Sequence, residues 1–144
     1  MKKTVDKRYA KSEGYKKVLS EIEKAKVCPF CPEHFKWHTK PVLKERGNWL
    51  ITSSFQPYEN SEWHLLLLSK VHKENFNELK PSDFSNLSYL VNWAVKKFKL
   101  KGGGLCMRFG DTLHTGATVC HIHAHLIVPK VVRGKSKPVW FPIG

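Results

Sequence analysis

The sequence contains no run of about 18 consecutive apolar residues, the length that a helix needs to cross a bilayer. Its first residues are charged and are not followed by the apolar segment of a secretory signal. These two absences predict a cytoplasmic protein that does not associate with membranes. Internal repeats and low-complexity linkers are absent too, so nothing marks a domain boundary. We therefore expect residues 1–144 to form one globular domain.

Acidic residues are scarce, because 12 Asp and Glu stand against 25 Lys and Arg, which gives a formal net charge of +13. Such an excess favours anionic partners such as nucleotides, polyphosphates or nucleic acid. Much of it lies in residues 2–26 and 130–137, where solvated, solubilising faces are the simpler explanation. Disulfides are not expected from the four cysteines in a reducing compartment, so metal ligation or burial is predicted for them.

Hydrophobic patterns predict four strands. Residues 48–53 and 63–68 are apolar runs separated by a polar turn, which indicates a hairpin. Residues 105–109 and 120–128 are two further candidates, separated by a loop that contains glycine. With one long helix between the two pairs, this order predicts an α+β fold with an antiparallel sheet.

One long helix is expected between the two strand pairs. It begins near Pro81, continues through apolar positions spaced three to four apart as far as Phe98, and ends before three consecutive glycines. A second helix is expected in residues 1–26, where apolar residues recur at helical spacing among many charges. We expect that helix to be peripheral, to fray, and to carry little chemistry.

Three histidines alternate with apolar residues near the end of the last predicted strand: His121, Ile122, His123, Ala124, His125 and Leu126. Because alternate side chains of a strand share a face, the imidazoles are expected to line one side and the apolar residues the other. An exposed polar face and a catalytic metal site with an open coordination position are two explanations. A third is nucleophilic catalysis, in which one neutral imidazole attacks phosphorus while its neighbours orient it and supply protons.

The run from His121 to Ile127 resembles the signature of the histidine-triad (HIT) superfamily, in which three histidines alternate with apolar residues. The likeness extends in the right order from Cys28 to Gly144. It includes a Pro-Tyr turn, a histidine opening an apolar strand, a Gly-x-Thr-Val segment and a Trp- and Pro-containing end, which are Pro57–Tyr58, His64–Leu68, Gly116–Val119 and Trp140–Gly144. The motifs are most similar to zinc-containing members that act on diadenosine polyphosphates or nucleoside phosphoramidates. The resemblance implies the HIT fold, with an antiparallel sheet of about five strands and one main crossover helix.

The resemblance also implies a role for each site residue. His123 would attack the α-phosphorus of a nucleotide and form a nucleotidyl-histidine intermediate. His125 would contact the phosphate and help to protonate the leaving group, and His64 would orient the imidazole through hydrogen bonding. The non-bridging oxygens would be held by Thr118 and the backbone amides around Gly116 and Ala117.

Two departures from the family pattern concern the phosphate side. Ala117 stands where many members have Gln, and residues 110–114 do not match the usual Asn-x-Gly loop. His114 and Arg108 are the candidates to replace the missing contacts. His64 as an ordinary buried histidine and Thr118 as an ordinary strand residue are the simpler explanations of those two positions.

Cys28 and Cys31 have the Cys-x-x-Cys spacing that lets two thiolates bind one ion, and a structural zinc site needs two more ligands. A redox pair is the other explanation, although no thioredoxin-like βαβ pattern surrounds them. By sequence distance alone, His34 and His38 are the nearest further ligands. The resemblance instead implies a structural zinc site completed by His72 and His121, which would anchor the N-terminal arm to the sheet.

The sequence therefore predicts a HIT-type nucleotide hydrolase or nucleotidyltransferase. The substrate would be a dinucleoside polyphosphate or a nucleoside phosphoramidate, and the protein would form a homodimer. One alternative is a nucleotide-binding or interaction protein of the same fold with little turnover. The other alternative is an enzyme that processes nucleic-acid ends. The net positive charge favours this alternative, but the sequence contains no recognisable DNA-binding finger.

Overall fold

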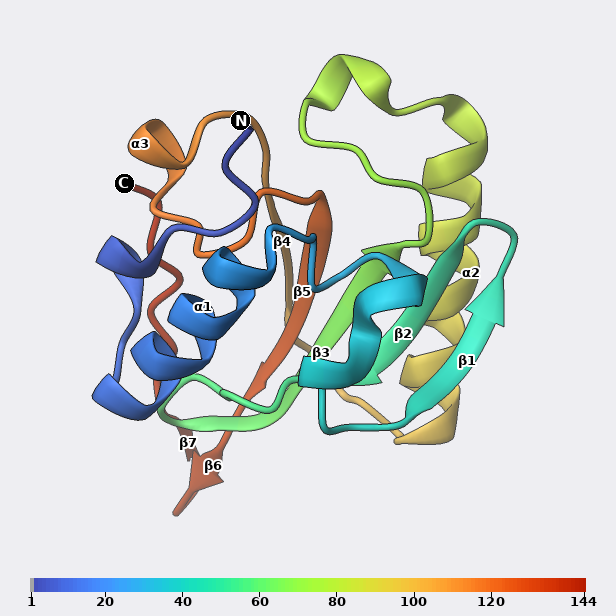
Figure 1. Cartoon of the computed structure of the whole chain (residues 1–144). Helices are drawn as coiled ribbons and strands as arrows, with labels where there is room; N and C mark the ends of the chain where they lie inside the picture. Colours follow the sequence, from blue (N-terminus) through green and yellow to red (C-terminus); the bar gives the residue numbers. More distant parts are fainter. Residues whose placement is uncertain (1) are drawn as a thin grey trace.

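A five-stranded antiparallel sheet forms the centre of the computed structural model, which describes residues 2–144 (Figure 1). The strand order is β1-β2-β3-β5-β4, so that β3 and β5 lie side by side in the middle. The strands are β1 (Val42–Arg46), β2 (Trp49–Ser53), β3 (Ser61–Ser69), β4 (Gly104–Arg108) and β5 (His123–Pro129). A small separate hairpin consists of β6 (Val131–Val132) and β7 (Lys135–Ser136). The predicted α+β architecture is confirmed.

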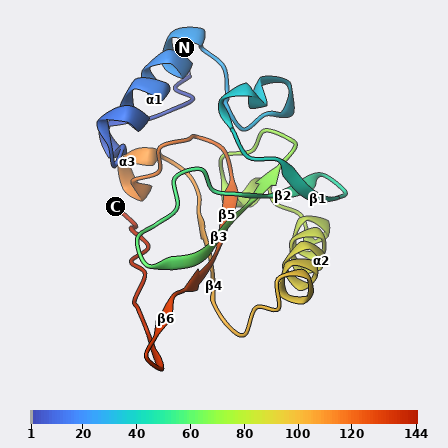
Figure 2. The same ribbon diagram turned by 90° about the horizontal axis from the view of Figure 1, so that it is seen from below.

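Helices cover both faces of the sheet. Within residues 2–144 the α-helices are α1 (Glu13–Ala25), α2 (Pro81–Lys97) and α3 (Thr112–Thr115), and the 3-10 turns are η1 (Lys7–Tyr9), η2 (Pro32–Trp37) and η3 (Phe76–Glu78). Figure 2 shows α2 on one side of the sheet and α1 on the other. No helix in residues 2–144 has the length and hydrophobicity needed to span a membrane.

The start of α2 is tied to the sheet by a buried carboxylate. Asp83 accepts hydrogen bonds from the Lys80 backbone amide at 2.7 Å and from the Trp49 indole of β2 at 2.8 Å. Lys73 also donates to it at 2.7 Å, and these donors hold the pKa of the carboxyl below its usual value although burial acts in the opposite direction. The predicted start of the long helix is confirmed, and Trp49 fixes where its first turn lies.

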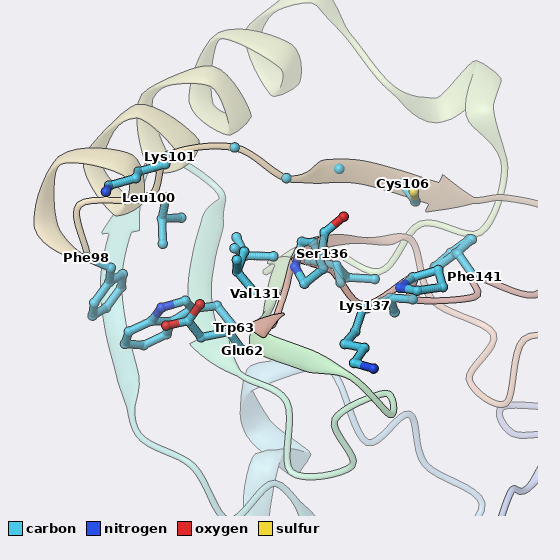
Figure 3. Close-up of a pocket in the computed structure, with 18 of the residues that line it drawn as sticks. Glu62, Trp63, Phe98, Leu100, Lys101, Cys106, Val131, Ser136, Lys137 and Phe141 are labelled. Carbon is cyan, nitrogen blue, oxygen red and sulfur yellow. The ribbon is translucent and has the colours of Figure 1, made fainter. Parts of the chain in front are cut away.

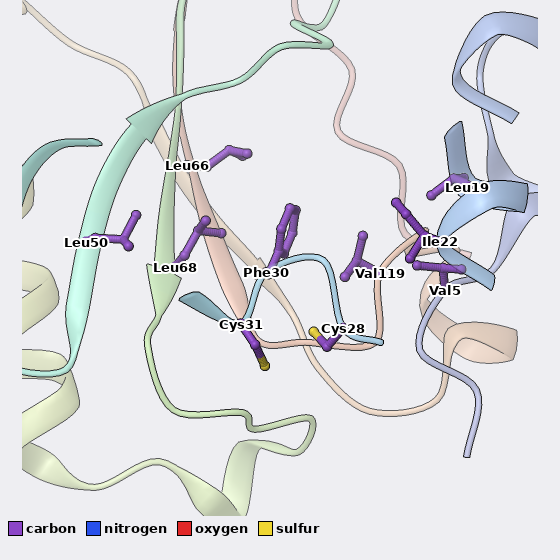
Figure 4. Close-up of a cluster of buried hydrophobic side chains, with 10 residues drawn as sticks. All are labelled: Val5, Leu19, Ile22, Cys28, Phe30, Cys31, Leu50, Leu66, Leu68 and Val119. Carbon is purple, nitrogen blue, oxygen red and sulfur yellow. The ribbon is translucent and has the colours of Figure 1, made fainter. Parts of the chain in front are cut away.

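Two hydrophobic clusters lie on the two faces of the sheet. Trp49, Ile51, Leu65 and Leu67 pack toward α2 together with Ile122, Ala124 and Leu126. Leu50, Leu66 and Leu68 point the other way, toward Phe30 and the N-terminal helix (Figure 4). Because both faces of β3 are covered, its sequence is a continuous run of leucines rather than an alternating pattern. Phe84 and Val95 were expected on the buried face of α2, but both side chains are exposed.

The N-terminal arm pairs with the segment that precedes β5. Val5 forms a bridge with Val119, and the Asp6 amide donates to the Thr118 carbonyl at 2.8 Å. Asp6 is 1% exposed, and its carboxylate accepts from Arg8 and Thr112. Arg8 holds the pKa of Asp6 well below its usual value. The segment expected to be peripheral therefore lies against residues 116–120, and Leu19 and Ile22 of α1 are buried.

Other elements differ from the sequence-based expectations, beginning with the hairpin of β6 and β7, which was not predicted. The outer strand β1 has no hydrophobic alternation and was not predicted, and its middle residues are only half-buried. The loop between β4 and β5 contains the short helix α3. The last strand begins at His123 rather than at Cys120, because residues 119–122 pair with Val5, Thr4 and Lys73 instead of with β3.

Candidate functional site

The three alternating histidines occupy the face of the chain opposite α2. Ile122, Ala124 and Leu126 pack in the cluster beneath the helix, as the alternation predicts. His123 and His125 lie on β5, between β3 and β4, whereas His121 precedes the strand. All three imidazoles are buried, with exposed fractions of 3% to 7%. An exposed polar face is therefore excluded as the explanation of the triplet.

His123 is held as a neutral imidazole with one free nitrogen. Its Nδ1 lies 2.7 Å from the carbonyl oxygen of His121, which can only accept, so we assign the ring proton to Nδ1. Burial lowers the pKa of His123 to about 3. The Nε2 lone pair is therefore available, and the Phe30 ring packs edge-on against the imidazole with 5.0 Å between centroids. This is the protonation state that a nucleophile needs.

His64 of β3 fixes the tautomer of His125. The backbone amide of Tyr58 donates to His64 Nδ1 at 3.0 Å, so neutral His64 carries its proton on Nε2. That proton points to His125 Nδ1 at 2.9 Å. Burial lowers the pKa of His64 to about 4 and that of His125 well below its usual value. Neutral His125 therefore carries its own proton on Nε2. The structure places His64 against His125 rather than against His123.

A pocket of about 350 Å³ lies over these histidines. Gly116 and Thr118 line it from the segment before β5, while Lys11 and Tyr15 come from the N-terminal arm. The Tyr15 hydroxyl and Thr118 Oγ1 are 3.0 Å apart. None of the described residues that line the pocket is Asp or Glu. Its walls combine neutral imidazoles, hydroxyls and cations, a composition that suits an anionic ligand.

The expected amide contacts to phosphate are already used inside the loop. The Gly116 amide donates to the Thr112 carbonyl at 2.9 Å, and the Ala117 amide to Thr115 Oγ1 at 3.2 Å. Ala117 is buried and does not line the pocket over His125. A phosphate role for these two amides stays a prediction, whereas the Thr118 side chain does reach the pocket.

Cys28, Cys31, His72 and His121 meet in a second cluster, which lies next to the histidine pocket. Their four ligand atoms lie within 4.8 Å of one another. Cys28 Sγ is 3.3 Å from His121 Nδ1, Cys31 Sγ is 3.5 Å from His72 Nδ1, and the two imidazole nitrogens are 3.2 Å apart. A zinc ion with tetrahedral ligands places such atoms about 3.3–3.8 Å apart. The cluster has the spacing to hold a metal ion.

Hydrogen bonds on the far side of both imidazoles orient their Nδ1 atoms toward the two cysteines. His121 Nε2 donates to the Ser69 carbonyl at 2.7 Å, and His72 Nε2 donates to the Glu74 carboxylate at 2.9 Å. Both Nδ1 atoms are then unprotonated, so two lone pairs face each other across 3.2 Å. A cation between them removes that repulsion. Burial also raises the pKa of the Cys31 thiol to about 12, so a thiolate there needs a neighbouring cation.

The two other candidate ligands lie outside this cluster. His38 Nε2 is 2.8 Å from Thr52 Oγ1, and its ring stacks on Phe35. His34 lies in the non-helical kink of η2 and is half-buried. In the folded chain, the two cysteines therefore cluster with His72 and His121, and not with His34 and His38.

Comparison with known proteins places this geometry in a family. The family profile described as the HIT domain matches residues 42–131. The chain belongs to the HIT domain family. That match includes His64, His72 and all three histidines of the triplet, whereas Cys28, Cys31 and Lys11 precede it. No significant relative was found among curated proteins.

Solved structures share the HIT fold at low sequence identity. One is a histidine triad nucleotide-binding protein from Candida albicans, with 22% identity, a TM-score of 0.60, and 82% of this chain and 85% of that chain covered. A zinc-bound histidine triad family protein from Mycobacterium smegmatis has 20% identity, a TM-score of 0.57, and the same coverage of 82% and 85%. A HIT family hydrolase from Legionella pneumophila has 24% identity, a TM-score of 0.53, and coverage of 73% and 95%.

Several residues that line the histidine pocket were not predicted from the sequence. Lys11, Ser12 and Tyr15 line the pocket but lie in the segment expected to carry little chemistry. Of the two residues proposed to replace missing family contacts, Arg108 lines the pocket and His114 is exposed outside it. No spacing rule relates the N-terminal arm to the histidines, so only the fold reveals these contacts. The expected homodimer stays a prediction.

A second, larger hollow has a volume of about 940 Å³ (Figure 3). Trp63, Phe98 and Lys101 line it, and no histidine does. Phe141 belongs to its wall, and the same ring lies 5.0 Å from the His125 ring, with the Arg108 guanidinium 4.7 Å from its centroid. Phe141 thus separates the hollow from the histidine pocket, and the histidines lie in the smaller of the two cavities.

The neutral state of buried His64 predicts a loss of stability in acid. Its pKa is about 4 in the folded chain but about 6.5 when unfolded, so the unfolded chain binds more protons below pH 6.5. The free energy of unfolding therefore falls as the pH decreases from 6.5 to about 4. We expect His64→Gln to reduce this pH dependence by up to about 1.4 kcal/mol per pH unit, measured by urea unfolding at pH 6 and 5.

The matched control is His114→Gln, because His114 is exposed. This variant should keep the pH dependence of the original chain. An unchanged slope in His64→Gln would contradict the assignment of a neutral, buried His64.

Proposed function

We propose that this HIT protein is a nucleotide hydrolase or nucleotidyltransferase that acts at an α-phosphorus through a nucleotidyl intermediate on His123. The observation that carries the proposal is the fixed tautomer of His123. Its Nδ1–H is bound to the His121 carbonyl, and its Nε2 is free in a pocket with cationic walls. The substrate class is a dinucleoside polyphosphate or a nucleoside phosphoramidate.

In the first step, His123 Nε2 forms a bond to the α-phosphorus as the bond from phosphorus to the leaving group breaks. The electron pair of that bond stays on the leaving atom, which accepts a hydrogen bond from the Nε2–H of His125, while the hydrogen bond from His64 keeps this tautomer in place. The positive charge that develops on His123 is stabilised by the His121 carbonyl at its Nδ1–H. In the second step, water or another acceptor attacks the phosphorus, the bond from phosphorus to His123 Nε2 breaks, and the proton of the attacking group passes to solvent.

The cluster of Cys28, Cys31, His72 and His121 is proposed to hold a structural zinc ion. When bound, zinc supplies a cross-link between the loop after α1, the turn after β3 and the residue two before His123. His121 contributes its Nδ1 to the cluster and its carbonyl to His123. The residues of the cluster therefore position the nucleophile without touching substrate.

The test of this function is a covalent adduct on His123. After incubation with a diadenosine polyphosphate and acid-free quenching, mass spectrometry should find adenylate attached through phosphorus to His123. The adduct should be absent from His123→Ala and present in His114→Ala, whose histidine lies outside the pocket.

Two alternatives make opposite predictions in the same experiment. A nucleotide-binding protein with little turnover would bind the dinucleotide tightly and never form the adduct. A nucleic-acid end-processing enzyme would form it only with oligonucleotides, and its affinity would fall steeply with salt. Either outcome would overturn the proposal.

A further inference from the structure

We propose that Lys11 and Arg108 form a phosphate-binding subsite for the leaving group, which makes this chain selective for nucleotides that carry phosphates beyond the reacting one. The inference rests on the proposed function, since it names the substrate class of the same site. Neither residue belongs to the histidine motif, and Lys11 lies outside the part of the chain that matches the family.

Arg108 is held rigidly at the edge of the histidine pocket. It is the last residue of β4, where it is paired with His123 of β5. Its Nη1 donates to the Pro142 carbonyl at 3.1 Å and its Nη2 to the Tyr58 hydroxyl at 3.2 Å. The Nε atom is buried and has no hydrogen-bond partner among the described residues. Within residues 2–144 no carboxylate forms an ion pair with this guanidinium.

Lys11 brings a second cation to the same tyrosine. Its Nζ lies 3.5 Å from the centre of the Tyr58 ring, whose hydroxyl accepts from Arg108. No carboxylate of the described chain pairs with Lys11 either. Burial and the charge of Arg108 lower the pKa of its ammonium. Two uncompensated cations against one ring repel each other, and an anion bound between them would relieve that cost.

Two hydrogen-bond donors of the pocket, one on Arg108 and one on His125, point toward each other. The Tyr58 amide donates to His64 Nδ1, and His64 Nε2 donates to His125 Nδ1, so the proton of His125 is on Nε2. Arg108 Nη2 lies 3.5 Å from that nitrogen, and a guanidinium can only donate. Two donors therefore face each other across 3.5 Å. An oxygen that accepts from both fits this geometry, and His125 is the proposed hydrogen-bond donor to the leaving group, so that oxygen belongs to the leaving group.

The charge of the substrate then decides between the two substrate classes. A nucleoside phosphoramidate carries its negative charge on the α-phosphate alone, which the proposed reaction already places at His123. A polyphosphate leaving group brings further negative oxygens past His125, toward Tyr58 and its two cations. Charge-assisted hydrogen bonds to such oxygens are the strong ones in proteins. The subsite therefore accelerates polyphosphate substrates more than phosphoramidates.

The test compares kcat/KM for a diadenosine tetraphosphate and for an adenosine phosphoramidate in the original chain, Lys11→Met and Arg108→Met. The ratio of the two values should fall by about 10-fold or more in each variant, because each loses a charged hydrogen bond. Lys16→Met is the matched control, since Lys16 is exposed on α1 and does not line the pocket; its ratio should stay as in the original chain.

Binding of inorganic tripolyphosphate to His123→Asn provides a readout that needs no turnover. Adding Lys11→Met or Arg108→Met to that variant should raise the Kd by about 10-fold or more. If the original chain turns over neither nucleotide but tripolyphosphate binding depends on both cations, the proposed function fails and the subsite stands. If both nucleotides are turned over and neither the ratio nor the Kd changes, the subsite is overturned and the proposed function stands.

Discussion

Replacing His123 by Asn is expected to lower kcat for nucleotide hydrolysis by about 10⁴-fold or more, a loss typical of removing an enzyme's nucleophile. The imidazole Nε2 is the atom proposed to bond to phosphorus, and Asn offers no comparable nucleophile. Nucleotide affinity should change little, because the cations and hydroxyls of the pocket remain. Steady-state kinetics and equilibrium nucleotide binding on the same preparation separate the two effects.

His125→Asn supplies the comparison within the same pocket. It removes the hydrogen-bond donor to the leaving group but keeps the nucleophile, so its loss in kcat should be smaller, about 10²–10³-fold. The loss in kcat should be smaller still for a substrate whose leaving group is more acidic and needs less stabilisation. A His123→Asn variant that retains a hundredth of the original kcat would contradict covalent catalysis by His123.

Much of the site was predictable because its signals are local. The alternation of His121, His123 and His125 with apolar residues needs only the two-residue period of a strand, and the structure reproduces it. The continuous leucines of β3 likewise predicted a buried strand. Even here the first histidine lies before β5 rather than in it, because its neighbours pair with the N-terminal arm.

The remainder depends on contacts that have no sequence spacing. Tyr15 meets Thr118 across 103 positions, and Asp6 meets Thr112 across 106. A charged N-terminal helix looks the same in sequence whether it covers an active site or only solvent. The metal ligands show the same limit, since the spacing of Cys28 and Cys31 gave no reason to prefer distant His72 over His34. Only the family resemblance selected the pair that the fold brings together.

The segment from His121 to His125 thus contributes to two clusters of side chains that share one residue. His121 offers its Nδ1 to the cysteines and its carbonyl to His123, so a shift of its backbone would alter both. Phe30 belongs to the loop that carries the two cysteines and packs on the rings of both His121 and His123. A change in the metal cluster is therefore expected to reach the nucleophile through this loop and this carbonyl.

Cys28→Ser is expected to lose bound zinc and to unfold on the order of 10 °C below the original chain. The physical reason is linkage, because a metal that binds only the folded state stabilises it, and a 1,000-fold loss of affinity removes about 4 kcal/mol. His72→Ala should act in the same direction, since it removes a second ligand of the cluster. Metal content by mass spectrometry and thermal unfolding in the presence of zinc measure both effects.

Cys106→Ser and His34→Ala are the matched controls, because Cys106 and His34 are of the same residue types as the cluster ligands but lie outside the cluster. Both variants should keep their zinc and their unfolding temperature. Zinc content that is unchanged in His72→Ala but lost in His34→Ala would contradict the proposed set of zinc ligands.

A Cys28→Ser variant that loses zinc should also lose activity on polyphosphate substrates, since Phe30 and the His121 carbonyl then no longer hold His123 in place. Full activity without zinc would show that the nucleophile is positioned by β5 alone.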